Sequence, residues 1–190
     1  MRYGARRLFE NLSFRLADGE RLAVLGENGS GKSTLLRVLA GVLTPTAGRV
    51  TLSVDGRDVP SHDLARAIGF AAPAVQLYDD LSAMENLVFV ARLRGLDAGR
   101  VPAMLDRVGL GGRGGDRVAA YSTGMRQRLR LATALLPDPP LLLLDEPGAT
   151  LDEQGRALVR DIVAAAPAVV LATNDPAEAV LCGRSVRLVS

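Results

Sequence analysis

Short, continuously apolar runs alternate with longer segments of helical periodicity along most of this chain. Two runs have the length and content of strands buried on both faces of a parallel sheet: 141–144 and 168–172. Apolar positions recur at helical spacing in three further segments: 33–43, 125–136 and 156–165. We therefore expect an α/β fold in which helices cover a parallel sheet.

Strict alternation of apolar and polar positions marks the segment before the apolar stretch 22–25. Leu12, Phe14 and Leu16 alternate with polar neighbours, and Asp18-Gly19 supplies a turn, so residues 8–25 predict an antiparallel hairpin. Residues 50–54 predict another short strand, and residues 186–189 predict a final edge strand. We expect a small antiparallel β lobe beside the parallel core.

Residues 73–136 have a different, helical character. Ser82 and Glu85 form the pattern of a capping box that opens a helix, and Gly95 is placed to end that helix. A short helix over 102–108 and a loop with five glycines over 109–115 follow. The chain therefore predicts one domain, with the core and β lobe from 1–72 and 137–190 and a helical subdomain inserted at about 73–136.

Composition and charge narrow the classes of protein. The 190 residues are 48% hydrophobic and 23% charged, which is ordinary for a folded domain. A formal net charge of +2 is too small to argue for nucleic-acid binding, and we expect none. A single cysteine and a single histidine argue against disulfides and a zinc site. No apolar run reaches the ~18 residues of a membrane span, so we expect a soluble, intracellular chain.

A glycine-rich segment between the apolar stretch 22–25 and the next helix fits the P-loop pattern. It reads Gly26-Glu27-Asn28-Gly29-Ser30-Gly31-Lys32-Ser33, followed by Thr34. Glycines let successive N–H groups point at phosphate oxygens, and the helix N-terminus adds positive charge. Lys32, the only lysine of the chain, is predicted to pair with the β- and γ-phosphates, and Ser33 to bind Mg²⁺.

Two carboxylates follow the apolar run 141–144. Ligands sit at the carboxyl ends of parallel strands, so Asp145 and Glu146 are expected beside the P-loop. We predict that Asp145 holds Mg²⁺ through water and that Glu146 orients and deprotonates an attacking water.

In this order the motifs resemble those of the nucleotide-binding subunit of ABC transporters, over essentially the whole chain. Ser122-Thr123-Gly124-Met125-Arg126-Gln127-Arg128 looks like the family's signature segment, with Thr123 in place of its first glycine. Gly148 to Asp152 looks like the loop that follows the acidic pair, and Tyr3 stands where the family stacks an aromatic ring on adenine.

The resemblance implies a P-loop NTPase fold, ATP and Mg²⁺ as ligands, and a head-to-tail pair formed with a second copy or a paralogous ATPase subunit. Ser122 and Gly124 of the signature segment would complete the site of the opposite subunit, and Asp152 would be a further nucleotide-binding residue. A separate transmembrane permease would receive the motion, on the 73–100 face of the helical subdomain. The chain would then lie in the cytoplasm, on the inner face of the cell membrane.

Two positions depart from the family pattern. Asn174 stands where the family has a histidine that touches the γ-phosphate, and an amide carries no charge near neutral pH. Pro73 stands where the family has a glutamine that contacts nucleotide and Mg²⁺, and Gln76, three residues later, is the candidate for that role.

Three hypotheses of function follow. The preferred one is an ATPase that energises export through a membrane subunit; Tyr121 to Arg126 and Ser82 to Asn86 look like the haem exporter of cytochrome c biogenesis. A second is a weakly active regulatory ATP-binding module, suggested by Asn174 and Pro73. A third is a soluble ABC ATPase that acts on nucleic acid or ribosomes, although Arg126, Arg128 and Arg130 read as a solvated helix face.

Overall fold

The structure is a computed structural model that describes residues 1–3 and 6–188, with the side chains of residues 2, 3, 6 and 7 outside that description. The strands are β1 (Arg2–Tyr3), β2 (Arg6–Arg7), β3 (Arg21–Leu25), β4 (Ser53–Val54), β5 (Arg57–Asp58), β6 (Ile68–Ala71), β7 (Leu141–Asp145), β8 (Val169–Ala172) and β9 (Arg184–Arg187). The helices are α1 (Lys32–Leu39), α2 (Leu64–Ala67), α3 (Ala83–Leu93), α4 (Val101–Arg107), α5 (Thr123–Leu135), α6 (Glu153–Ala165) and α7 (Pro176–Ala179). Short 3₁₀ turns lie at Ser61–Asp63, Ala98–Arg100, Gly111–Arg113 and Val118–Ala120.

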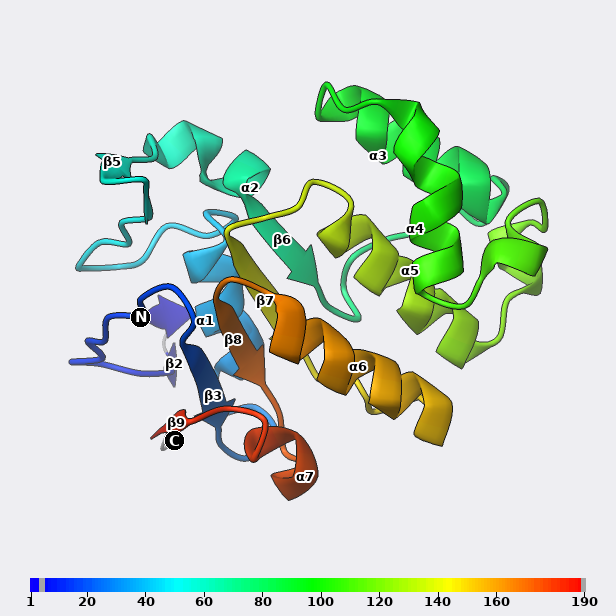
Figure 1. The fold of residues 1–190 in the computed structure, drawn as a ribbon. Coiled ribbons are helices and arrows are strands. Elements are labelled where there is room, and N and C mark those ends of the chain that lie inside the picture. Colours follow the sequence, from blue (N-terminus) through cyan, green and yellow to red (C-terminus); the bar gives the residue numbers. More distant parts are fainter. Residues whose placement is uncertain (4–5, 189–190) are drawn as a thin grey trace.

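A five-stranded parallel sheet forms the centre of the molecule, in the order β6-β7-β8-β3-β9 (Figure 1). The strands β7, β8 and β3 are neighbours, so their carboxyl ends meet at one edge of the sheet. The predicted α/β fold of a parallel sheet with helices is confirmed.

The apolar side chains of β7 alternate between the two faces of the sheet. Leu142 and Leu144 belong to the larger hydrophobic cluster, which includes residues of α3, α4, α5 and α6. Leu143 belongs to the second cluster, which includes residues of α1 and α2. This burial on both faces explains why the strand is continuously apolar.

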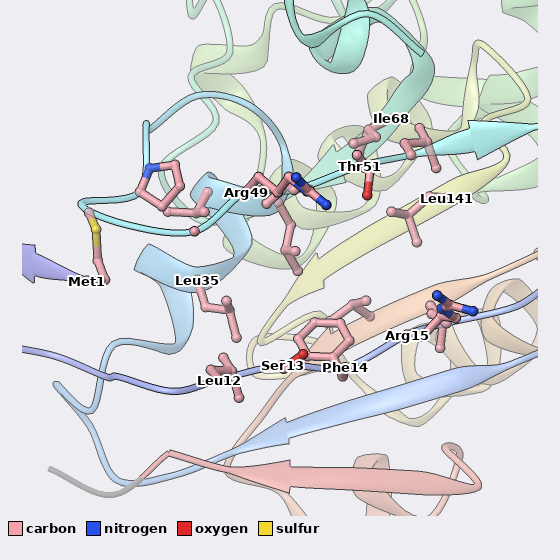
Figure 2. Close-up of a pocket in the computed structure, with 18 of the residues that line it drawn as sticks. Met1, Leu12, Ser13, Phe14, Arg15, Leu35, Arg49, Thr51, Ile68 and Leu141 are labelled. Atoms are coloured by element: carbon pink, nitrogen blue, oxygen red, sulfur yellow. The ribbon is translucent and has the colours of Figure 1, made fainter. Parts of the chain in front are cut away.

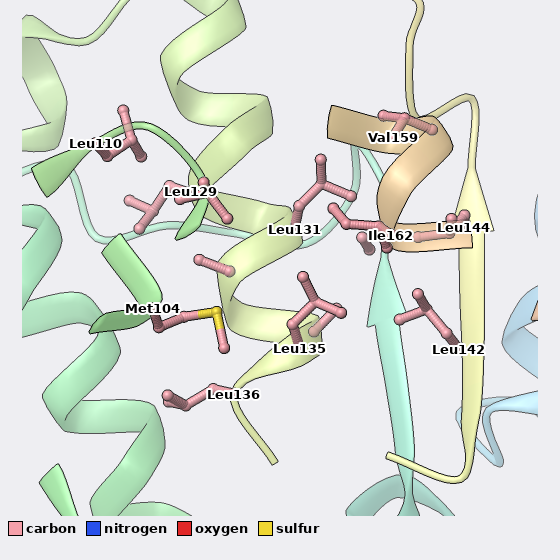
Figure 3. Close-up of a cluster of buried hydrophobic side chains, with 14 of the residues drawn as sticks. Met104, Leu110, Leu129, Leu131, Leu135, Leu136, Leu142, Leu144, Val159 and Ile162 are labelled. Carbon is pink, nitrogen blue, oxygen red and sulfur yellow. The ribbon is translucent and has the colours of Figure 1, made fainter. Parts of the chain in front are cut away.

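Helix α5 joins the sheet to the helices α3 and α4. Figure 3 shows Leu131 and Leu135 of α5 beside Leu142 of β7 and Ile162 of α6, while Leu129 lies on the side of Leu110. The helix begins at the predicted signature segment, so its packing fixes that segment relative to the sheet.

Antiparallel pairing is much shorter than the sequence predicts. Within the described residues it consists of two two-stranded sheets, β1 with β2 and β4 with β5, and an isolated bridge between Ser82 and Arg117. The predicted hairpin over 8–25 is wrong: β3 pairs in parallel with β8 and β9, and residues 12–16 form no strand. Alternation correctly places Leu12, Phe14 and Leu16 against the second cluster, but it does not specify a strand partner.

A groove of about 890 Å³ is lined by two segments of the predicted β lobe, residues 9–16 and 47–53. Leu12 and Phe14 line it together with Leu35 of α1, and Arg49 and Thr51 line it from the opposite segment (Figure 2). The predicted strand over 50–54 is therefore reduced to Ser53–Val54, which pairs with β5.

No helix within residues 1–3 and 6–188 is both long enough and apolar enough to cross a membrane.

Candidate nucleotide site

The P-loop connects β3 to α1 at the carboxyl edge of the sheet. Gly26 has φ +153°, and a Cβ at this position would lie 2.8 Å from the carbonyl oxygen of Leu188 and would also press on Ser30. Gly31, with φ +102°, caps α1. Glu27, Asn28 and Gly29 form the exposed rim of the loop, and Ser33 and Thr34 lie half-buried in the first turn of α1.

Lys32 lies buried beneath the loop and has an acceptor for each of its three ammonium protons. Its Nζ donates to the carbonyl oxygens of Gly26 at 2.7 Å and Glu27 at 3.2 Å, and to Oδ1 of Asn174 at 2.9 Å. The ammonium is therefore directed at the inside of the loop curve, where the backbone N–H groups of a P-loop receive phosphate.

The two carboxylates after β7 lie at the same edge. Glu146 Oε1 is 3.8 Å from Lys32 Nζ, and the Glu146 side chain is 28% exposed. Its backbone has φ +48°, the left-handed region, and its N–H donates to the carbonyl oxygen of Ala172 at 2.8 Å. This bend at the end of β7 turns the carboxylate toward the lysine while leaving it open to water.

Asp145 is buried, and its Oδ1 has no hydrogen-bond partner among the described residues. Burial raises the pKa of its carboxyl group, while a hydrogen bond with Ser33 and the charge of Lys32 act in the opposite direction. A cation would supply the missing partner of Oδ1 and stabilise the charged form. Hydroxyl and carboxylate oxygens are ligands that Mg²⁺ accepts, so Ser33 and Asp145 fit this ion.

Asn174 follows β8 and bridges Lys32 to the rim of the P-loop. Its Oδ1 accepts from Lys32, and its Nδ2 donates to Asn28 Oδ1 at 2.6 Å. The structure thus brings together four residues predicted from three separate motifs: Lys32, Asp145, Glu146 and Asn174.

Ser122, Gly124 and Asp152 do not join this group. Ser122 caps α5 by accepting from the N–H of Met125 at 3.2 Å, and Asp152 caps α6 by accepting from the N–H of Gly155 at 2.8 Å. All three line a separate cavity of about 490 Å³ that contains none of the P-loop residues. Arg128 also lines this cavity and donates to Asp152 at 3.0 Å.

Two further predicted residues, Gln76 and Tyr3, have no described contact with the nucleotide site. Gln76 lies exposed in the loop after β6 and makes no hydrogen bond with any residue that the structure describes, and Pro73 is exposed in the same loop. The side chain of Tyr3 lies outside the described residues.

The arginines of α5 are not a solvated face, contrary to the prediction. Arg126 Nη1 donates to Asp79 Oδ1 at 2.6 Å, and Arg130 Nε donates to the carbonyl oxygen of Val75 at 3.0 Å. Residues four apart lie on one face of a helix, so α5 holds the loop of Gln76 at two points.

Sequence reasoning missed two buried polar residues near the site. Gln127 Nε2 donates to the carbonyl oxygen of Pro147 at 3.2 Å, and the Glu178 carboxylate accepts from Gly148 after β7 and from Thr173 after β8. Pro147 lies 20 residues from Gln127 and Gly148 lies 30 residues from Glu178, so no local sequence pattern indicates these two contacts.

Comparison with known proteins places these motifs in a family. The family model described as "ABC transporter" matches residues 9–149. The chain belongs to the ABC transporter family. The motif resemblance is thus confirmed, and the chain is an ATP-binding domain of that family.

Relatives of this ABC domain serve different systems. A cytochrome c biogenesis ATP-binding export protein of Rhodopseudomonas palustris is 38% identical over 91% of this chain and 87% of its own length. A daunorubicin resistance ATP-binding protein of Streptomyces coeruleorubidus is 39% identical over 94% of this chain. An Fe(3+) ions import ATP-binding protein of Streptomyces coelicolor is 41% identical over 94% of this chain. The chain spans only 59% and 54% of the length of the last two relatives.

Solved structures agree with the ABC fold. The structure of an ATP-binding subunit of an ABC transporter matches with a TM-score of 0.84 and 28% identity, over 98% of this chain and 81% of that one. A dimeric bacterial ABC transporter cassette matches with a TM-score of 0.82 at 24% identity, which supports the fold alone.

Proposed function

We propose that this chain hydrolyses ATP and that two copies, or one copy and a paralogous subunit, drive a membrane permease. The observation that carries the proposal is the meeting of Lys32, Glu146 and Asn174 at the edge of the sheet where Asp145 has an unpartnered buried oxygen. Ligands of open parallel sheets bind at this edge.

Each residue has a chemical role in this proposal. Lys32 pairs with the terminal phosphates, and Asn174 donates to the γ-phosphate through its amide. Glu146 orients the attacking water and accepts its proton. Mg²⁺ on Ser33 and Asp145 would neutralise charge on the β- and γ-phosphates.

The test is ATP turnover by the Glu146→Gln variant. The amide keeps the shape of the side chain but accepts no proton, so we expect turnover to fall about 100-fold or more with ATP binding retained. Glu153→Gln is the matched control, because Glu153 is an exposed carboxylate on α6 whose only described partner is Arg160. Unchanged turnover in Glu146→Gln would remove Glu146 from the reaction.

The separation of the signature residues from the P-loop supports the head-to-tail pairing of two subunits. Ser122, Gly124 and Asp152 line a cavity to which no P-loop residue of the same chain contributes. A second subunit turned head to tail would bring such a surface over the nucleotide. The Glu146→Gln variant should then form an ATP-dependent dimer, which light scattering measures.

An exposed apolar patch supports the permease as a partner. Tyr78 is 54% exposed and packs edge-on against Phe89 of α3, with the ring centroids 5.2 Å apart, and Leu93 follows Phe89 by one helical turn. The patch lies beside the loop that Arg126 and Arg130 hold, so a partner bound there would act on Gln76 and, through α5, on Ser122. We therefore place the chain in the cytoplasm against the inner membrane face.

We propose haem as the exported cargo. The support is the similarity to the cytochrome c biogenesis export protein, which extends over 91% of this chain and 87% of the relative. The resistance and import relatives show that identity near 40% does not settle cargo or direction. Identifying the membrane protein that co-purifies with this chain tests this part of the proposal.

A regulatory module with slow turnover is the second candidate. The observation that favours it is the hydrogen bond by which Asn174 engages Lys32. Efficient turnover by the unmodified chain would exclude it.

A further inference from the structure

Glu178 is a buried carboxylate that none of the proposed catalytic steps uses. It lies on α7, 9% exposed, next to the turn that follows β8. Burying a carboxylate is costly unless hydrogen bonds satisfy it, so its partners are informative.

Each carboxylate oxygen of Glu178 binds a different loop of the nucleotide site. Oε1 accepts from the backbone N–H of Gly148 at 2.7 Å, two residues after Glu146. Oε2 accepts from the hydroxyl of Thr173, the residue before Asn174. These hydrogen bonds oppose the rise in pKa that burial causes at Glu178.

Thr173 transmits the contact to the turn that carries Asn174. It is fully buried, and its Oγ1 also accepts from the backbone N–H of Asp175 at 3.0 Å. The hydroxyl therefore contacts both Glu178 and the residue after Asn174, which limits the directions that the exposed Asn174 side chain can take.

Gly148 contacts the other carboxylate oxygen of Glu178. A Cβ at Gly148 would overlap Glu178 Oε1, so the loop comes as close to the carboxylate as glycine alone permits. The same loop continues to Asp152, which caps α6 and accepts a hydrogen bond from Arg128 of α5.

We propose that Glu178 is a positioning residue that holds the loop of Glu146 and the turn of Asn174 at a fixed separation around the nucleotide. The inference rests on the proposed function, because it assigns catalytic roles to those two residues. Misplacement of a reacting group by about 1 Å can cost about 100-fold in rate. Glu178 would thus act on turnover without touching ATP.

Steady-state kinetics of Glu178→Ala and Glu178→Gln test the proposal. We expect Glu178→Ala to lower kcat by about 10- to 100-fold and to leave the KM for ATP within about threefold. Glu178→Gln should recover most of the activity, because an amide oxygen still accepts from Gly148 and the amide nitrogen can donate to Thr173. A purely structural role would lower the active fraction without this split or rescue.

Amide hydrogen exchange gives a readout that does not depend on activity. In Glu178→Ala we expect faster exchange at both Gly148 and Asp175, with the wild-type rates restored in Glu178→Gln. Unchanged exchange at these amides, or an unchanged kcat in Glu178→Ala, overturns the proposal. If the wild-type chain lacks turnover, the proposed function fails, while the exchange result still decides whether Glu178 holds the two loops.

The double variant of Glu178→Ala with Thr173→Val tests whether the two residues act as one unit. Val keeps the shape of Thr173 and removes the hydroxyl. Thr173→Val alone is measured as well, because Val at this position also removes the acceptor of the Asp175 N–H. We expect the double variant to lose less kcat than the product of the two single losses, because both changes break the same hydrogen bond between Glu178 and Thr173. Losses that multiply overturn the route through Thr173.

Discussion

At the scale of single residues, the hydrogen bonds of Lys32 determine how its ammonium group could pair with a phosphate. Its three protons already have acceptors, and one of these is the side chain of Asn174. A γ-phosphate that pairs with Lys32 would have to share or replace that acceptor, so we expect Asn174 to affect how readily the ammonium becomes available. An uncharged amide suits this position because it can accept from Lys32 and donate to Asn28 at once.

Asn174→His tests this expectation. An imidazole can donate to the γ-phosphate but competes less well for Lys32 when protonated, so we expect a higher kcat than in the wild type. The pH profile should also gain an ionisation near the ordinary histidine pKa of about 6.5. ATPase assays between pH 5.5 and 8.5, with roughly half-unit steps, measure both effects. Equal kcat values and identical profiles for the two proteins would show that Asn174 does not limit turnover.

The residues of the site were predictable to different degrees. Lys32 follows the loop after β3, Asp145 ends β7 and Glu146 comes next, so local sequence and parallel-sheet geometry suffice to bring them together. Glu178 was not predictable, because its acidic side chain reads as an ordinary first-turn residue of a short helix. Its hydrogen bond to Gly148 joins positions 30 residues apart, which only the tertiary fold brings together.

At the scale of elements, local sequence patterns predicted the structure correctly where nearby side chains satisfy the backbone hydrogen bonds. The capping box of α3 is formed as predicted: Ser82 accepts from the N–H of Glu85 at 3.1 Å, and Glu85 accepts from the N–H of Ser82 at 2.7 Å. The hairpin over 8–25 failed because alternation indicates an extended, half-buried segment and leaves its neighbour undefined. A run as apolar as Leu22 to Val24 belongs in a central parallel strand rather than in a hairpin.

The capping box makes α3 a measurable contributor to stability. Ser82→Ala removes the acceptor for the Glu85 N–H, and we expect a loss of about 1 kcal/mol in the free energy of unfolding. Denaturant titration measures it, with Ser13→Ala as the matched control because Ser13 is exposed. A loss no larger than that of the control would show that the cap does not stabilise α3.

The same box gives a pH dependence with a defined sign. Hydrogen bonds from Ser82 hold the pKa of Glu85 below its ordinary value of 4.5. A lowered pKa means that the ionised carboxylate stabilises the folded state above pH 4.5 and that this contribution disappears as the pH falls through the lowered pKa. Glu85→Gln should therefore be less stable than the wild type at pH 7 and should approach it in acid. A stability difference that does not change with pH contradicts this assignment.

At the scale of the whole molecule, the larger hydrophobic cluster connects the sheet, the helical region and the C-terminal turn. Cys182, the only cysteine of the chain, belongs to that cluster together with residues of α3, α5 and β7. Its thiol is 9% exposed, and burial raises its pKa to about 11. The thiol is therefore protected twice, by packing and by protonation, as long as the cluster stays closed.

Thiol labelling of Cys182 should consequently report global opening and its dependence on nucleotide. At pH 8 only about one thiol in a thousand is ionised, so the native chain should label far more slowly than the chain in denaturant. ATP with Mg²⁺ at about 100 times its Kd should slow labelling by about 100-fold, because ligand binding stabilises the folded state. Lys32→Ala should lose this protection while keeping the slow basal rate. If ATP protects neither protein, the P-loop does not bind nucleotide in this chain; if both are protected equally, Lys32 is not part of that binding.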